Sequence, residues 1–260
     1  MTLVVHVPFI DVFAGPRRDL ERVTQARMGE NLAEVETQGS YSLVECEDGY
    51  RGWIDREGVT DIGSDYYARS HDVLAIMEPF VPISSDPDHF DPFTIATMGS
   101  RLAFAANERG KQRILLPNQK IGYVIACEVR PADNPFPTRG AKGVVRTSLR
   151  LRGVPYLWGG TTPWGLDCSG FVQLVFRVNG YSVKRDAQIQ YDTAGKIVAP
   201  GDITTGDLLF FKKGSETKVS HVAIYLGSDK IIHSSGRAGK VLVEYLEALR
   251  QILVGARRVI

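Results

Sequence analysis

The chain has 260 residues, of which 43% are hydrophobic and 23% charged, a composition typical of a globular protein with two or three domains. Its 31 Lys and Arg against 30 Asp and Glu leave a formal net charge of +1, which argues against a nucleic-acid-binding protein or a protein held on an anionic membrane surface. No apolar stretch approaches the roughly 20 residues needed to cross a bilayer. We therefore predict no nucleic-acid partner and no membrane partner.

The cysteine pattern and the N-terminus indicate where the protein works. Cys46, Cys127 and Cys168 lie far apart and form no CxxC pair, so neither a disulfide framework nor a zinc knuckle fits, and a reducing compartment fits best. The stretch MTLVVHVPFIDVFAGPRR lacks the basic start and the uninterrupted apolar run of a signal peptide. We interpret it as the first strand of a folded domain and expect a cytoplasmic protein.

The first half of the chain reads as short antiparallel strands. Turn signals at Gly29, Gly39 and Asp48-Gly49 separate alternating runs in residues 1–64, where only ARMGEN has a weak helical pattern. Residues 65–133 repeat this pattern loosely, since MGENLAEVE corresponds to MGSRLAFAA, and GYRGWID to IGYVIACEV. We predict two copies of one all-β module, with a domain boundary in the Pro-rich linker RPADNPFPTRG.

Beyond this linker the pattern changes to helices followed by strands, which is an α+β order. VVRTSLRLRG predicts a helix with Val145 and Leu149 on one face. SGFVQLVFRVN predicts a second helix that starts at Asp167 or Cys168 and is ended by Gly180. The segments DLLFFKK, HVAIYLG, KIIHSS and ILVGARRVI predict strands.

Cys168 is a candidate nucleophile because it stands at the predicted start of a helix. The helix dipole and the unpaired N–H groups there favour an anion and lower the pKa of a thiol. A buried cysteine that only packs in the core is the alternative. His221 and His233 follow on two strands joined by a short turn, so they can lie close together. His221 suits the role of the base and His233 the role of the group that orients it.

A zinc site is a second interpretation of Cys168, His221 and His233, because three ligands and a water make a catalytic centre. The sequence has no HxH or HExxH pair and no carboxylate at a ligand-like offset from these residues. We therefore predict no metal and no other cofactor.

The motifs of the second half resemble a known family. YLWGGTTPWGLDCSGFVQ, KRDAQIQY, PGDITTGDLLFF, SHVAIYLG and IIHSS occur in the order found in NlpC-type cysteine peptidases of bacterial cell-wall metabolism, over residues 139–260. The N-terminal modules resemble bacterial SH3-like domains, which commonly end in a GYxGWV-type strand, here GYRGWI. The resemblance implies two small SH3-like barrels, over 1–64 and 65–133, and a permuted papain-like α+β catalytic domain over 134–260.

The resemblance also implies residue roles. The catalytic triad would be Cys168, His221 and His233. Residues expected to contact the substrate are the pocket walls Tyr156 and Trp158, the polar groups Asp167, Ser169 and Asp186, and Glu30 and Tyr50, our candidates in the first SH3-like module for binding a free L-alanine amine. Core packing of the two aromatic residues and simple helix capping by Asp167 are the structural alternatives.

The activity implied is that of a γ-D-glutamyl-L-diamino acid endopeptidase. It would hydrolyse the bond between γ-D-glutamate and meso-diaminopimelate or lysine in free L-Ala-γ-D-Glu murein peptides, in peptidoglycan recycling or remodelling. Its partner would be a murein-derived peptide with a free L-alanine N-terminus. Two alternatives stay open: a wall-binding protein that uses its SH3-like modules, and a thiol amidase or acyltransferase with the same Cys-His pair.

Overall fold

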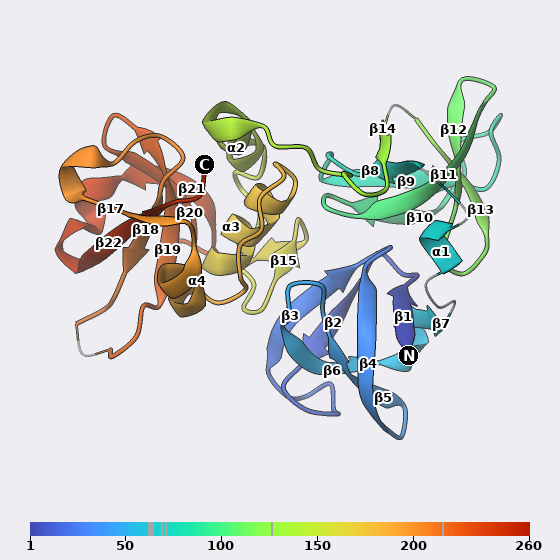
Figure 1. Ribbon diagram of the computed structural model, residues 1–260, viewed down its shortest axis with the longest axis horizontal. Coiled ribbons are helices and arrows are strands. Elements are labelled where there is room, and N and C mark those ends of the chain that lie inside the picture. The colour runs from blue at the N-terminus through green and yellow to red at the C-terminus, as the bar shows by residue number, and fades with distance from the viewer. Residues whose placement is uncertain (62–64, 69, 71, 126, 215) are drawn as a thin grey trace. The chain divides into compact units, whose positions relative to one another are not determined.

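The computed structural model describes residues 1–260 apart from 62–64, 69, 71, 126 and 215. The chain divides into two compact units, Met1–Phe136 and Pro137–Ile260 (Figure 1). Among the described helices, none is both long and apolar enough to span a membrane.

The first unit begins with a seven-stranded antiparallel sheet in the order β3-β2-β6-β5-β4-β1-β7. Its strands are β1 (Thr2–Val5), β2 (Phe9–Phe13), β3 (Arg22–Arg27), β4 (Asn31–Gln38), β5 (Tyr41–Glu45), β6 (Arg51–Asp55) and β7 (Val59–Asp61). Alternate residues of these strands, among them Leu3, Val5, Val12 and Leu32, point into one apolar core. The ARMGEN stretch is not helical, because it forms the end of β3 and the turn into β4.

The second half of this unit repeats the first. After the short helix α1 (Asp65–Ala68), a second seven-stranded sheet has the order β10-β9-β13-β12-β11-β8-β14, which is the first order with seven added to each number. Its strands are β8 (Asp72–Ala75), β9 (Phe80–Ser84), β10 (Pro92–Thr97), β11 (Arg101–Glu108), β12 (Lys111–Leu115), β13 (Ile121–Val124) and β14 (Glu128–Pro131). The predicted internal repeat is confirmed.

The two modules are SH3-like β domains, but each strand order has two ends, so within the described residues neither sheet closes into the barrel that we expected. The division at residues 64 and 133 stays a prediction. Its first boundary lies outside the described residues, and both modules fall in one compact unit.

The second unit packs helices on one antiparallel sheet of six strands, in the order β17-β22-β18-β19-β20-β21. The helices are α2 (Gly140–Arg150), α3 (Cys168–Arg177) and α4 (Ala187–Thr193), and a small hairpin, β15 (Thr161–Thr162) and β16 (Gly165–Leu166), precedes α3. The strands are β17 (Lys196–Val198), β18 (Leu208–Phe211), β19 (His221–Gly227), β20 (Lys230–Ser235), β21 (Lys240–Tyr245) and β22 (Leu253–Arg258). Helix α3 packs on β19 and β20 (Figure 1). Its residues Phe171, Leu174 and Val175 are wholly buried.

Most of the predicted elements of this unit are present, and one helix face is wrong. The predicted helix from Asp167 and the four predicted strands all form, whereas α4, β17 and β21 were not predicted. In α2 the buried residues are Val144, Thr147 and Ser148, while Leu149 is 40% exposed. Hydrogen bonds explain this choice, because the Thr147 hydroxyl contacts the buried Asn179 amide at 3.0 Å, and polar groups so paired can be buried at little cost.

Candidate active site

Cys168 is the first residue of α3, and Asp167 is the N-cap of this helix. The Asp167 carboxylate accepts a hydrogen bond from the Gly170 N–H at 2.7 Å, as an N-cap acid does. The Cys168 side chain is 8% exposed, and its thiol lies 3.9 Å from the Ser220 carbonyl oxygen. The Val222 N–H also forms a hydrogen bond to this sulfur, so the thiol lies against the start of β19.

Close backbone contacts hold the start of α3, and they require glycine. A Cβ atom on Gly170 would lie 2.2 Å from the Gly160 carbonyl oxygen, and one on Gly160 would lie 2.3 Å from the Gly165 carbonyl oxygen. In this arrangement the Asp167 N–H donates to the Gly160 oxygen at 3.1 Å, and the Gly159 N–H donates to the Asp167 carboxylate at 3.0 Å. The glycines of WGG and CSG therefore allow the β15–β16 hairpin to pack closely against the start of α3, where Cys168 lies.

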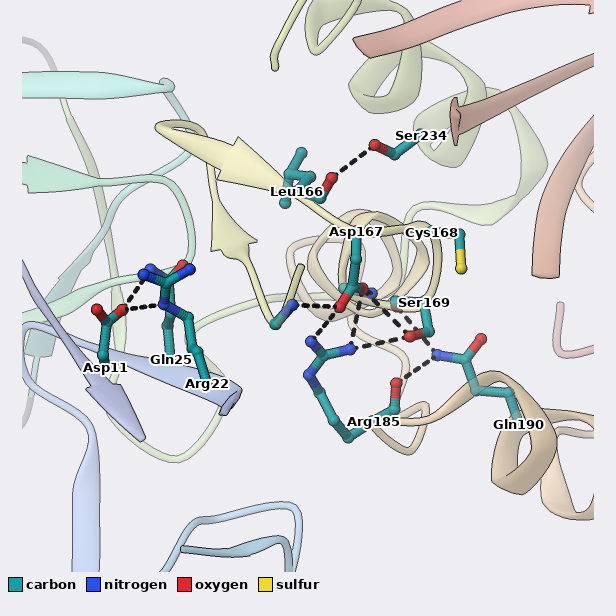
Figure 2. Close-up of polar contacts among 12 residues, drawn as sticks. Asp11, Arg22, Gln25, Leu166, Asp167, Cys168, Ser169, Arg185, Gln190 and Ser234 are labelled. Carbon is teal, nitrogen blue, oxygen red and sulfur yellow. Dashed lines mark hydrogen bonds and ion pairs between the residues drawn. The ribbon is translucent and has the colours of Figure 1, made fainter. Parts of the chain in front are cut away.

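Figure 2 shows a buried polar network on the other side of Asp167. The Arg185 guanidinium, whose side chain is 2% exposed, donates to both Asp167 oxygens, at 3.0 and 2.5 Å, and to the Ser169 hydroxyl at 2.9 Å. Gln190 from α4 donates to the Ser169 carbonyl oxygen at 3.1 Å. The sequence reasoning missed Arg185 and Gln190, although both lie in the KRDAQIQY block. Asp167 is an N-cap and an ion-pair partner at once.

The two candidate histidines lie together on the sheet. His221 is the first residue of β19 and His233 lies in β20, and His221 Nε2 is 2.6 Å from His233 Nδ1. Next to His233, the Ser234 hydroxyl donates to the Leu166 carbonyl oxygen at 2.6 Å, which ties β20 to the strand that leads into Asp167 (Figure 2). The described residues contain no group of three or more His, Cys, Asp and Glu side chains placed to hold a metal ion.

Burial sets the protonation states of the three candidate catalytic groups. It raises the pKa of Cys168 to about 12, with a further contribution from the Asp167 charge. It lowers the pKa of His221 to about 3, and His233 and Lys213 add to this effect. At neutral pH the resting site therefore holds a neutral thiol and a neutral imidazole. The lowering of the thiol pKa that we expected from the helix start is outweighed by desolvation.

Glu244 extends the histidine pair, and sequence reasoning missed it too. This residue of β21 places its Oε1 2.8 Å from His233 Nε2, and its Oε2 lies 3.3 Å from the Arg237 guanidinium. The signal that could have found Glu244 is an acid inside the apolar stretch KVLVEY, directly after the strand of His233.

The other residues of the second unit that were predicted to contact the substrate differ in their surroundings. Tyr156 is half-buried, and burial raises its pKa to about 12, with further contributions from the Cys168 and Asp167 charges. Trp158 is 62% exposed, so it is not a core aromatic residue. Asp186 is the half-buried N-cap residue of α4 and makes no capping hydrogen bond with its side chain.

Glu30 and Tyr50, the residues predicted to bind an amine, lie in the first unit. The Glu30 side chain is 7% exposed, and its carboxylate accepts from the Arg27 guanidinium at 2.8 Å and from the Arg27 N–H at 3.2 Å. Tyr50 is half-buried, and its N–H donates to the Asp48 carboxylate at 2.9 Å. Both roles stay predictions.

Comparison with known proteins gives the class to which this fold and this site belong. Residues 153–258 match the NlpC/P60 family, and residues 12–59 match the bacterial dipeptidyl-peptidase Sh3 domain. The chain belongs to the NlpC/P60 cysteine peptidases, with a bacterial SH3 domain in its N-terminal part.

Two individual relatives have more specific names, and one solved structure has the same fold. A γ-D-glutamyl-L-lysine dipeptidyl-peptidase of Bacillus cereus is 27% identical over 226 residues, which cover 81% of this chain and 66% of that protein. A protein of the same name from Bacillus subtilis is 42% identical over 105 residues, which cover 39% of this chain and 35% of that protein. The chain thus spans less than two thirds of the length of these curated relatives. A crystal structure of an NlpC/P60 family protein from Bacillus cereus shares the fold, with a TM-score of 0.90 at 22% identity over 99% of both chains.

Proposed function

We propose that this protein is a cysteine endopeptidase that hydrolyses the γ-D-glutamyl to L-diamino acid bond of free L-Ala-γ-D-Glu murein peptides. The observation that carries the proposal is the hydrogen-bonded pair of His221 and His233 at 2.6 Å, together with the Cys168 thiol at 3.9 Å from the carbonyl oxygen of Ser220, the residue before His221. The relatives named γ-D-glutamyl-L-lysine dipeptidyl-peptidase support the choice of bond.

The reaction starts from the neutral pair. His221 takes the proton of the Cys168 thiol as the sulfur attacks the γ-carbonyl carbon of D-glutamate, so the S–H bond breaks while an S–C bond forms. The Cys168 N–H, at the free N-terminal end of α3, donates to the developing oxyanion, a contribution of roughly 3 kcal/mol. His221 then protonates the leaving amine of the diamino acid, and a water activated by His221 hydrolyses the thioester.

The residues around the thiol supply the substrate contacts. Trp158 and Tyr156 are walls of the pocket, and the exposed indole of Trp158 offers an apolar surface to the peptide. Asp186 is a further acid on the substrate side of the site. Asp167 and Ser169 already bond Arg185, so any contact that they make with the D-glutamate carboxylate or the amine adds to that network.

Selection for a free L-alanine amine belongs to the first SH3-like module in this proposal. A buried ammonium needs a carboxylate and other acceptors, or its desolvation is uncompensated. Glu30 is such a carboxylate, although Arg27 holds it in the structure, and Tyr50 is the second candidate. The three free cysteines agree with work in a reducing compartment, and we propose recycling of murein peptides in the cytoplasm.

Mass spectrometry of reaction products tests this function. L-Ala-γ-D-Glu-L-Lys and L-Ala-γ-D-Glu-meso-diaminopimelate are each incubated with the protein, with a free and with an acetylated N-terminus, and C168A is the control. We expect L-Ala-D-Glu and the free diamino acid from the unblocked peptides only, and no product with C168A. Equal cleavage of the acetylated peptides would refute the amine selection, and no cleavage of any peptide would refute the substrate.

A further inference from the structure

Three neighbouring strands place His221, His233 and Glu244 on the same face of the sheet. Ile224 of β19 pairs with Ile232 of β20, a register that puts His221 and His233 on one face in diagonal positions. His233 pairs with Leu242 of β21, and Glu244 lies two residues further on the face of Leu242. The three side chains therefore form a row across the strands. The Cys168 thiol lies 3.9 Å from the carbonyl oxygen of Ser220, the residue before His221.

The row has one consistent pattern of hydrogens. A neutral imidazole has one N–H donor and one acceptor nitrogen, and a carboxylate only accepts. Glu244 Oε1 lies 2.8 Å from His233 Nε2, at ion-pair distance but without the alignment of a hydrogen bond. A carboxylate at this distance favours the hydrogen on Nε2, and His233 Nδ1 is then an acceptor. His221 Nε2, at 2.6 Å from His233 Nδ1, is then the donor of that pair. His221 Nδ1 is left as the acceptor, the state that a base needs.

We propose that Glu244 is a positioning residue of the active site, which fixes the tautomers of His233 and His221 so that His221 Nδ1 is free to accept the Cys168 proton. The inference rests on the proposed cysteine peptidase function and deepens it. In this proposal Glu244 acts through His233, the imidazole that it contacts.

The charges around the row give Glu244 a second effect. Burial lowers the pKa of His233, and the Glu244 carboxylate opposes this while the Arg237 guanidinium adds to it. Burial lowers the pKa of His221, and His233 and the Lys213 cation lower it further. When His221 takes the proton, the new positive charge lies one imidazole away from Glu244. The carboxylate therefore stabilises the charged pair that forms during attack.

Two variants separate these effects. Glu244→Ala removes the acceptor, so His233 is free to change tautomer, whereas Glu244→Gln keeps the size of the side chain and removes its charge. Glu247→Gln is the matched control, because Glu247 is 73% exposed and pairs with Arg250 at 2.7 Å, away from the histidines. We expect E244A to lower kcat about tenfold to a hundredfold, less than the roughly 10⁴-fold loss when the acid of a catalytic triad is replaced.

The readout is the tautomer of each ring, measured by proton–nitrogen NMR correlation on protein with isotope-labelled histidine, together with the pH profile of kcat/KM. Wild type and E247Q should carry the hydrogen on Nε2 of both His221 and His233, and E244A should lose this preference at His233. In E244Q the acid limb of kcat/KM should move to lower pH, because a histidine pair without the carboxylate is harder to protonate.

Unchanged tautomers in E244A, together with an unchanged acid limb in E244Q, would overturn the proposal even if the activity fell. If wild type cleaves none of the peptides, the proposed substrate fails, while the NMR spectra still decide the role of Glu244.

Discussion

Replacing Arg185 by methionine should destabilise the second unit without unfolding the first. The guanidinium is 2% exposed, its partner Asp167 is 9% exposed, and the pair is bidentate. Arg185→Met keeps an apolar stem of similar length and leaves the Asp167 carboxylate without its cation in a buried site. Removing one partner of a buried ion pair costs about 3–5 kcal/mol, because the other charge is left desolvated.

The structure places the expected loss at the lower end of this range. After the substitution, the Asp167 carboxylate still accepts hydrogen bonds from the Gly159 and Gly170 N–H groups and from the Ser169 hydroxyl. We therefore expect a loss of about 3 kcal/mol. With a urea m-value of about 2 kcal/mol/M, the unfolding midpoint should fall by about 1.5 M.

Tryptophan fluorescence can follow the second unit alone. The chain has 3 tryptophans, and in a Trp53→Phe background the signal comes from Trp158, just before the β15–β16 hairpin, and Trp164, in its turn. Arg250→Met is the matched control, since Arg250 pairs with Asp229 at 2.7 Å with a 46% exposed side chain, and we expect it to cost less than about 1 kcal/mol.

The double variant D167N/R185M decides whether the pair is coupled. It should lose at least about 1 kcal/mol less than the sum of the single variants, because no charge is then left unpaired. Additive losses, or a loss below about 1 kcal/mol for R185M, would refute the view that this ion pair holds the start of α3.

Two further predictions concern protonation. Because the pKa of His221 falls from 6.5 in the unfolded chain to about 3 in the folded protein, stability should be lost as the pH drops through this window, by up to about 1.4 kcal/mol per pH unit. Urea midpoints between pH 6.5 and about pH 5 should therefore fall more steeply for wild type than for H221Q, and equal slopes would contradict this. Since the pKa of Cys168 is raised to about 12, its alkylation by iodoacetamide in a C46A/C127A background should keep rising with pH. An alkylation rate that stays high and constant into the acid pH range, measured by intact mass, would instead show that the resting protein holds a thiolate–imidazolium pair.

The N-terminal repeat could be predicted because its two copies keep the same backbone requirement. Gly29 and Gly99 both have a positive φ, of 83° and 88°, and each follows a methionine at the turn before the longest strand of its sheet. A left-handed turn favours glycine at that position, so both copies keep the Met-Gly pair while most of the surrounding residues differ. The same reasoning failed for α2, because its buried face is decided by a partner, Asn179, that lies far away in the sequence.

The start of α3 could be predicted for a local reason. An N-cap acid, a following glycine and an apolar stripe are features of adjacent residues, so DCSGFVQLVF carries them without tertiary information. Arg185 lies 18 residues from Asp167, and only the packing of the segment before α4 brings its guanidinium into the buried network.

Glu244 differs from Arg185, because the sequence does contain its position once the strands are paired. The stretch KVLVEY was not predicted as a strand, and without it no register relates Glu244 to His233. With the observed pairing of His233 and Leu242, the two-residue period of a strand puts Glu244 on the histidine face. A shift by one residue would turn the carboxylate to the opposite face and leave His233 Nε2 facing an apolar side chain. The role of Glu244 is therefore a property of the strand register.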